Sequence, residues 1–222
     1  MSREKDSLPV VEIFKSIQGE GPFSGTPSVF LRLAFCNLRC TWCDSDYTWK
    51  GKVEFMWKSL DELKEKILSY GIKHLIVTGG EPLLWEKRFF PLIEDLLNIN
   101  FDIEVETNGT IQSFLPEKVY FNVSPKLSNS GNSLKKSIKS DVLRSFNERE
   151  RVIFKFVIKS ERDLIEVIDL KEKVGIENRR IFLMPEGKSY LELREKRRLV
   201  YDLSRRYGFR YTDRLHILMG VK

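Results

Sequence analysis

Short apolar runs alternate with longer stretches of helical periodicity, and this alternation limits the folds open to the chain. The runs predicted as strands cover residues 29–35, 74–78, 103–107, 119–123, 152–158, 181–184 and 215–219. Helical periods cover residues 86–98, 161–174 and 190–207, and a capping box at Ser59 and Glu62 begins a helix that extends to about Tyr70. Strand–helix alternation favours an α/β fold with a parallel sheet, which right-handed crossovers curl towards a full or partial (β/α) barrel.

The chain is predicted to form one domain over residues 1–222, because no internal repeat or linker divides it. Its polar start predicts disorder over residues 1–8. Residues 127–150 are expected to form a variable loop or helix. Within them, the small and polar residues 127–133 are interpreted either as a mobile lid or as an inert surface loop.

Composition argues against several classes of function. The net charge is +6, but basic and acidic residues alternate along helical stretches such as 61–66, as on solvated helix faces rather than nucleic-acid surfaces. No apolar run reaches the roughly 18 residues of a membrane span, and the start lacks an apolar signal core. We therefore expect a cytoplasmic protein with no membrane or nucleic-acid partner, whose basic surface attracts anionic small molecules or an acidic electron carrier.

The only three cysteines lie within eight residues, at Cys36, Cys40 and Cys43, in the spacing C-x3-C-x2-C. Three thiolates leave a tetrahedral zinc site one ligand short, and His74 and His216 are both distant in the sequence. A 4Fe–4S cluster held by three cysteines instead keeps one iron open to a small molecule. The spacing therefore predicts catalysis at an iron–sulfur cluster.

Two other interpretations of the cysteines stay open on the sequence. They could be buried free thiols, or zinc ligands completed by a distant histidine. A disulfide framework is disfavoured, because three is an odd number and no signal peptide indicates an oxidising compartment.

Polar residues and glycines follow several predicted strands at their carboxyl ends. The cysteine loop follows residues 29–35, and later strands are followed by residues 78–82, 106–109, 124–126 and 184–187. Ligands of parallel α/β proteins gather at the carboxyl ends of strands, so these segments are expected to form one active-site face. Taken singly, each is also compatible with an ordinary turn.

Arg32 lies in the middle of an otherwise apolar strand, and a buried arginine needs a partner. We expect that partner to be Glu20, in the glycine-containing segment 16–23, or an anionic ligand. A fixed guanidinium suits a phosphate or a carboxylate.

Three segments together resemble the radical S-adenosylmethionine (SAM) superfamily: Cys36-x3-Cys40-x2-Cys43, Gly79–Pro82 and Glu106–Gly109. Further segments resemble one of its families, the 7-carboxy-7-deazaguanine synthases of queuosine and archaeosine precursor synthesis: the Gln18–Gly21 loop, the Arg32 strand, Cys43–Ser45 and His216–Gly220. The resemblance runs from about Val11 to the C-terminus, and residues 127–150 match poorly.

The resemblance implies a trimmed, partial (β/α) barrel of the radical SAM type. It also implies a carbon–nitrogen lyase that converts 6-carboxy-5,6,7,8-tetrahydropterin to 7-carboxy-7-deazaguanine by hydrogen abstraction, ring contraction and release of ammonia. The implied cofactors are a 4Fe–4S cluster, SAM and Mg²⁺, with the reduced cluster cleaving SAM to a 5′-deoxyadenosyl radical. Homodimers are usual in the family, and flavodoxin or ferredoxin would suit as reductant.

Site residues carry over from the family position by position. Metal ligands would be Cys36, Cys40 and Cys43 for the cluster and Ser45 for Mg²⁺. SAM would contact Trp42, Asp44, Gly80, Ser124, Pro125, Lys126, Met184, Pro185, Glu186 and Gly187. The pterin would contact Ile17, Gln18, Gly19, Glu20, Arg32, Thr78, His216 and the terminal carboxylate of Lys222. Many members have threonine at the position of Ser45, and serine supplies the same hydroxyl oxygen. Some members have a more polar residue at the position of Met184.

Two rival functions stay open on the sequence. A radical SAM activase that forms a glycyl radical on a protein shares the cysteine spacing, but it gives the Gln18–Gly21 loop, Arg32 and His216 no role. An electron carrier or nucleic-acid-binding iron–sulfur protein would normally present four cysteines. Ammonia release from the tetrahydropterin separates the first rival, and a mobility-shift assay at several salt concentrations tests nucleic-acid binding.

Overall fold

The computed structural model describes residues 7–221 and contains a nine-stranded sheet in the order β3-β1-β2-β4-β5-β6-β7-β8-β9. The strands are β1 (Ser7–Ile17), β2 (Pro27–Leu33), β3 (Met56–Ser59), β4 (His74–Gly79), β5 (Asp102–Thr107), β6 (Tyr120–Val123), β7 (Val152–Ile158), β8 (Ile181–Pro185) and β9 (Arg210–Tyr211). β1 pairs antiparallel with β2 and β3, and the pairs from β2–β4 to β8–β9 are parallel. Within residues 7–221 no pairing joins β3 to β9, so the expected partial barrel is confirmed.

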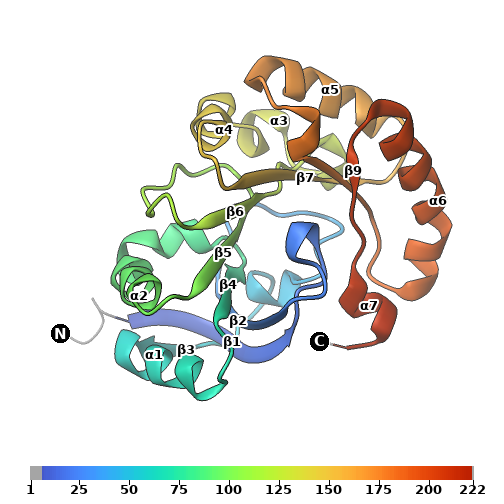
Figure 1. Ribbon diagram of the computed structural model, residues 1–222. Helices are drawn as coiled ribbons and strands as arrows, with labels where there is room; N and C mark the ends of the chain where they lie inside the picture. The colour runs from blue at the N-terminus through green and yellow to red at the C-terminus, as the bar shows by residue number, and fades with distance from the viewer. Residues whose placement is uncertain (1–6, 222) are drawn as a thin grey trace.

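Helices line the outside of the curved sheet (Figure 1). They are α1 (Leu60–Ser69), α2 (Glu86–Asn98), α3 (Leu134–Ser137), α4 (Ser140–Asn147), α5 (Asp163–Val174) and α6 (Tyr190–Tyr207), whereas α7 (Leu215–Met219) lies at the open side of the sheet. The predicted capping box at Ser59 and Glu62 is present at the start of α1. In the part of the chain described, no helix combines the length and the apolar character that a membrane crossing requires.

Alternation along the strands separates an apolar outer face from a polar inner one. On β7, Phe154 and Phe156 belong to the hydrophobic core, whereas Lys155 lies between them and lines a cavity. On β5, Ile103 and Val105 belong to the same core. Because successive side chains of a strand point to opposite faces, the helices cover the apolar side and the charged residues collect inside the curve.

Several predictions about the chain ends were wrong. Residues 215–219 were expected as a strand, but they form the short helix α7 at the open side of the sheet. Disorder was expected through residue 8, yet Ser7 and Leu8 begin β1, where Leu8 is fully buried. Residues 1–6 lie outside the described part of the chain. β1 and β3 were not predicted at all.

The segment 127–133 packs against the cysteine loop, so it is not an inert surface loop. It contains a 3₁₀ turn at Ser128–Ser130. The Trp42 indole Nε1 donates to the carbonyl oxygen of Asn129 at 3.0 Å. The backbone N–H of Thr41 donates to the carbonyl oxygen of Ser130, also at 3.0 Å. The small, polar residues therefore serve as one wall of the cysteine loop.

Two segments far apart in the sequence bridge the open side of the sheet. The backbone N–H of Leu215 donates to the carbonyl oxygen of Gly19 at 3.0 Å, and that of Gly21 donates to the Thr212 hydroxyl at 2.8 Å. The loop after β1 and the start of α7 are therefore joined beside the inner face of the sheet.

Candidate active site

A cavity of about 380 Å³ opens on the inner face of the sheet and is lined from the carboxyl ends of β2, β4, β5, β6, β7 and β8. Most residues predicted from the sequence line it. These are Ile17, Gln18, Gly19, Glu20, Arg32, Cys36, Cys40, Trp42, Cys43, Asp44, Ser45, Thr78, Gly80, Ser124, Lys126, Met184 and His216. The expectation that the strand ends form one face agrees with this arrangement.

Four of the predicted residues do not line the cavity. Pro125, Pro185, Glu186 and Gly187 are buried in the two turns behind it. The Glu186 carboxylate accepts from Lys196 Nζ at 2.7 Å, and the Gly187 carbonyl oxygen accepts from Arg214 at 3.1 Å. These residues support the wall. Lys222 lies outside the described residues.

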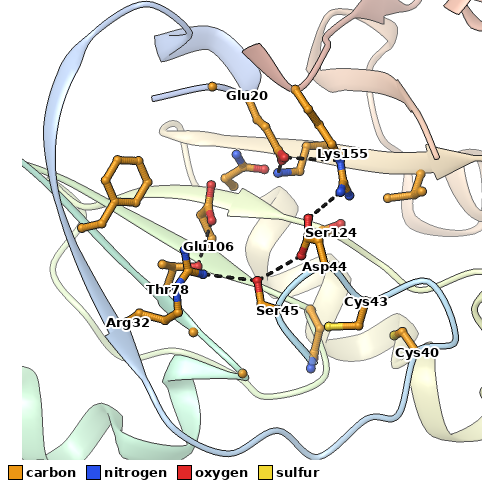
Figure 2. A pocket seen from close by; sticks show the side chains of 18 of the residues that line it. Glu20, Arg32, Cys40, Cys43, Asp44, Ser45, Thr78, Glu106, Ser124 and Lys155 are labelled. Atoms are coloured by element: carbon orange, nitrogen blue, oxygen red, sulfur yellow. Dashed lines mark hydrogen bonds and ion pairs between the residues drawn. The ribbon is translucent and has the colours of Figure 1, made fainter. Parts of the chain in front are cut away.

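The three cysteine thiols face the cavity, and each sulfur accepts at least one N–H donor, with Asn108 Nδ2 as a second, longer donor to Cys36 at 3.9 Å (Figure 2 labels Cys40 and Cys43). Cys36 Sγ accepts from the backbone of Leu38 at 3.4 Å, Cys40 Sγ from Asn132 Nδ2 at 3.3 Å, and Cys43 Sγ from Trp49 Nε1 at 3.4 Å. Burial raises the pKa of the free Cys36 thiol to about 11 and also raises that of Cys40. A metal removes that barrier by binding the thiolate, and N–H donors on the sulfurs suit an iron–sulfur cluster.

Among the described residues, no group of three histidine, cysteine, aspartate or glutamate side chains is placed to hold a single metal ion. A cubane bonds each thiolate to a different iron, so its sulfurs stand farther apart than ligands of one ion. The described residues therefore give no support to the zinc site that the sequence left open.

The Gly79-Gly80-Glu81 turn joins three strand ends. A Cβ on Gly80 would lie 2.0 Å from the carbonyl oxygen of Phe35, so only glycine allows the cysteine loop to approach this closely. The fully buried Glu81 accepts from the Thr107 hydroxyl at 2.8 Å and from the backbone N–H of Asn108 at 2.7 Å. The glycines thus leave backbone at the cavity surface, while the glutamate is structural.

Arg32 has a different protein partner from the one expected. Its Nε donates at 2.7 Å to the carboxylate of Glu12, which lies directly opposite Arg32 on β1. Its Nη1 lies 3.4 Å from the Ser45 hydroxyl. Glu20 pairs instead with Lys155 (Figure 2) and with Arg214. Glu12 therefore orients the guanidinium, which lines the cavity where an anion can reach it.

Arg214 connects the cysteine loop with the rest of the site. It is 3% exposed, and its Nη1 donates to Asp44 at 2.5 Å, while its Nε lies 3.6 Å from Glu20. Burial alone would raise the pKa of Asp44, but Arg214, the Ser45 hydroxyl and Arg32 together outweigh it and hold that pKa well below its usual range. Asp44 is therefore an anion beside Cys43 at neutral pH.

A second acidic group lies deeper on β5. The Gln18 amide donates to Glu104 at 2.9 Å and to Glu106 at 3.3 Å, and the Thr78 hydroxyl donates to Glu106 at 2.9 Å. Burial, followed by the neighbouring charge of Glu106, raises the pKa of Glu104 to about 8. Glu104 is therefore mostly neutral at pH 7, and Glu106 is the carboxylate that lines the cavity.

Sequence reasoning did not select several residues that line the cavity or brace it: Glu12, Asn132, Lys155 and Arg214. For Lys155 a signal was available, because it stands in an apolar strand as Arg32 does. Alternation places Lys155 on the inner face for the same reason. For Asn132 and Arg214 the sequence carries no such signal.

Gly19 allows His216 to approach the loop after β1. A Cβ on Gly19 would lie 2.3 Å from His216 Nδ1 and 3.1 Å from its backbone nitrogen. We expect Gly19→Ala to displace the imidazole and to lower the free energy of unfolding by about 1–3 kcal/mol, as overpacking does. Denaturant unfolding measures this loss.

The control is the same substitution in a His216→Ala background, where the ring is absent. There Gly19→Ala should cost clearly less, because most of the clash is removed. An equal cost in both backgrounds would show that the imidazole is not what excludes the methyl group.

Comparison with known proteins agrees with this geometry. The sequence signature of the radical SAM superfamily matches residues 31–129. The chain is 38% identical to the 7-carboxy-7-deazaguanine synthase of Pyrobaculum aerophilum over 94% of this chain and 93% of that protein. It is 37% identical to that of Hyperthermus butylicus, over 96% of this chain and 93% of that protein.

Among solved structures, the crystal structure of QueE from Escherichia coli superposes with a TM-score of 0.78 at 26% identity, covering 95% of both chains. Streptococcus suis SuiB bound to S-adenosylmethionine shares the fold, with a TM-score of 0.53 and 13% identity over 81% of this chain and 48% of that one. On these likenesses, the chain belongs to the 7-carboxy-7-deazaguanine synthase family of radical SAM enzymes.

Proposed function

We propose that this chain converts 6-carboxy-5,6,7,8-tetrahydropterin to 7-carboxy-7-deazaguanine with release of ammonia, as a step in 7-deazapurine biosynthesis. The supporting observation is that three cysteine thiols and a guanidinium oriented by Glu12 line one cavity. Its volume of about 380 Å³ is of the size that small-molecule sites have. A glycyl-radical activase would need room for a protein segment, and no observation favours it.

Cys36, Cys40 and Cys43 hold the 4Fe–4S cluster in this proposal. When bound, the cluster and SAM supply the one-electron cleavage that generates a hydrogen-abstracting radical. The residues proposed to contact SAM within the cavity are Trp42, Asp44, Gly80, Ser124, Lys126 and Met184. Lys126 Nζ donates to the Ser124 hydroxyl at 2.7 Å and lies 5.8 Å from the centre of the Trp42 ring, so these three form one surface beside the cysteines. The turn at Pro185–Gly187 and Pro125 support that surface from behind.

The pterin is proposed to bind on the side of the cavity opposite to SAM, against Ile17, Gln18, Gly19, Glu20, Thr78 and His216. Arg32 binds its carboxylate, and Ser45 is the proposed protein ligand of Mg²⁺. The Ser45 hydroxyl donates to Asp44 at 3.0 Å and lies 3.4 Å from Arg32 Nη1. Oxygen ligands of this kind suit Mg²⁺. A carboxylate there would be shared between the ion and the guanidinium.

Arg32→Lys should raise KM for the pterin, because an ammonium replaces the planar fork that pairs with a carboxylate in bidentate fashion. Hydrogen bonds to charged groups contribute roughly 1.5–3 kcal/mol, so the expected increase is on the order of 10- to 100-fold. KM for SAM should stay unchanged, and Arg88→Lys, outside the cavity, is the matched control. Equal increases in both KM values would argue against carboxylate recognition by Arg32.

The physiological context proposed for the chain is that of a cytoplasmic homodimer reduced by flavodoxin or ferredoxin. The net charge of +6 supports an acidic electron carrier as partner. Sedimentation measures the oligomeric state, and replacing dithionite by each carrier measures the preference for reductant. A monomer in solution would remove the dimer from the proposal without affecting the chemistry.

An anaerobic assay tests the proposed function directly. The reconstituted protein is incubated with dithionite, SAM, Mg²⁺ and 6-carboxytetrahydropterin, and mass spectrometry follows 7-carboxy-7-deazaguanine and 5′-deoxyadenosine. Both products are expected. Deoxyadenosine without the deazaguanine would keep the radical chemistry but overturn the substrate. Absence of both, with the cluster present, would favour an electron carrier.

A further inference from the structure

We infer that Asn132 is a positioning residue that sets the reduction potential of the cluster through its hydrogen bond to Cys40. Under the proposed function, Cys40 is a thiolate ligand of iron. Asn132 Nδ2 lies 3.3 Å from Cys40 Sγ, although the two residues are 92 positions apart in the sequence. No residue of the cysteine loop itself provides this donor.

The orientation of the Asn132 amide is fixed by its other partners. Its Oδ1 accepts from the backbone N–H of Arg39 at 2.9 Å, and a backbone N–H only donates. The oxygen must therefore face Arg39, which leaves the NH₂ group directed to Cys40 and to the Ser130 hydroxyl, 3.2 Å away. An amide flip would lose the contacts to Arg39 and to the thiolate.

The segment that carries Asn132 is itself anchored on both sides of the site. Asn129 Nδ2 donates to the Val157 carbonyl oxygen on β7 at 2.9 Å, and Asn129 accepts from the Trp42 indole. Ser130 accepts from the backbone of Thr41 at 3.0 Å. The donor therefore stays at the sulfur because its backbone is held by β7 and by the cysteine loop.

A donor at a thiolate acts on the two oxidation states of the cluster unequally. Reduction adds one negative charge, part of which falls on the cysteine sulfurs. An N–H directed at a sulfur therefore stabilises the reduced form more and raises the potential. Of the other sulfur donors, Leu38 uses its backbone, Asn108 lies 3.9 Å from Cys36 Sγ, and Trp49 also stacks on Arg39, with the guanidinium 4.9 Å from its ring centre. Asn132 is the donor that substitution removes most cleanly.

The test is a redox titration of the reconstituted protein without substrate, followed by electron paramagnetic resonance. Asn132→Leu removes the donor at similar size, and Asn132→Asp replaces it with a carboxylate while keeping the acceptor for Arg39. Both should shift the midpoint potential to more negative values, with the larger shift for Asn132→Asp. Asn129→Asp places the same charge on the same segment without a sulfur contact, and its shift should be smaller than that of Asn132→Asp.

The cluster signal and iron content are measured in every variant, independently of turnover. An unshifted potential in Asn132→Leu at full iron content would overturn the tuning role, whether or not the deazaguanine forms. Loss of the cluster in Asn132→Asp but not in Asn129→Asp, with unchanged thermal unfolding, would support it, because a carboxylate beside a thiolate repels the cluster. Failure of the wild type to take up iron would instead overturn the proposed function.

Discussion

Cys40→Ala should abolish iron uptake and product formation while leaving the fold in place. In the proposed site each of the three thiolates would bind a different iron, so two remaining cysteines would leave a cubane with two open positions. Cys40 is 9% exposed, and losing one small buried side chain costs about 1 kcal/mol, the usual effect of a point substitution. Iron content, visible absorbance and the yields of both products measure the loss, and circular dichroism checks the fold.

Thr41→Val is the matched control, because it changes the neighbouring residue of the same loop without touching a thiol. The Thr41 side chain is exposed, and the backbone N–H that holds the loop to Ser130 is unchanged by this substitution. Full iron content is therefore expected. A Cys40→Ala chain that keeps the cluster and its activity would mean that another group ligates the third iron.

The position of the site was predictable because parallel strands end at the same face. Residues 29–35 and 74–78 were predicted from their apolar character, and β2 and β4 pair in parallel as that prediction requires. The segments that follow them, with Cys36 and Gly80, therefore line one cavity without any long-range information.

The edges of the sheet were not predictable in the same way. β1 carries Pro9 and Lys15 within its span, and β3 has only four residues, with Met56 and Trp57 exposed. Neither shows a clean apolar run, because an antiparallel or edge strand is buried less completely. Residues 215–219 show such a run, yet they lie beyond the last strand and form a helix against the loop at Gly19.

Charge partners were the least predictable part of the site. Arg32 was expected to pair with Glu20, but the two strands β1 and β2 place Glu12 directly opposite it. Arg214 and Asp44 pair across 170 positions of sequence. An ion pair of this kind depends on how the open side of the barrel closes, which no local pattern encodes.

Arg214→Met should destabilise the fold more than Cys40→Ala or any other substitution proposed for the site. It removes a guanidinium that is 3% exposed and leaves Glu20 without one of its two cationic partners. Breaking a buried pair by removing one partner costs about 3–5 kcal/mol. For a chain of this length, that loss lowers Tm by roughly 6–20 °C. Arg198→Met is the matched control, since its pair with Asp202 lies on the surface and should contribute about 0–1 kcal/mol.

The loss of Tm in Arg214→Met should also depend on pH, and the pKa shifts of Glu20 and Asp44 determine the direction of that dependence. Burial raises the pKa of Glu20, but Lys155 and Arg214 outweigh it, so the pKa of Glu20, like that of Asp44, is lowered on folding. Groups with a lowered pKa contribute stability above their unfolded pKa of about 4, and they lose it as the pH falls towards the folded value. The difference in Tm between wild type and Arg214→Met should therefore be full at pH 7 and should narrow below about pH 4. A difference that stays constant over this range would mean that Arg214 stabilises the fold by packing and by its bond to the Gly187 carbonyl, and not by charge.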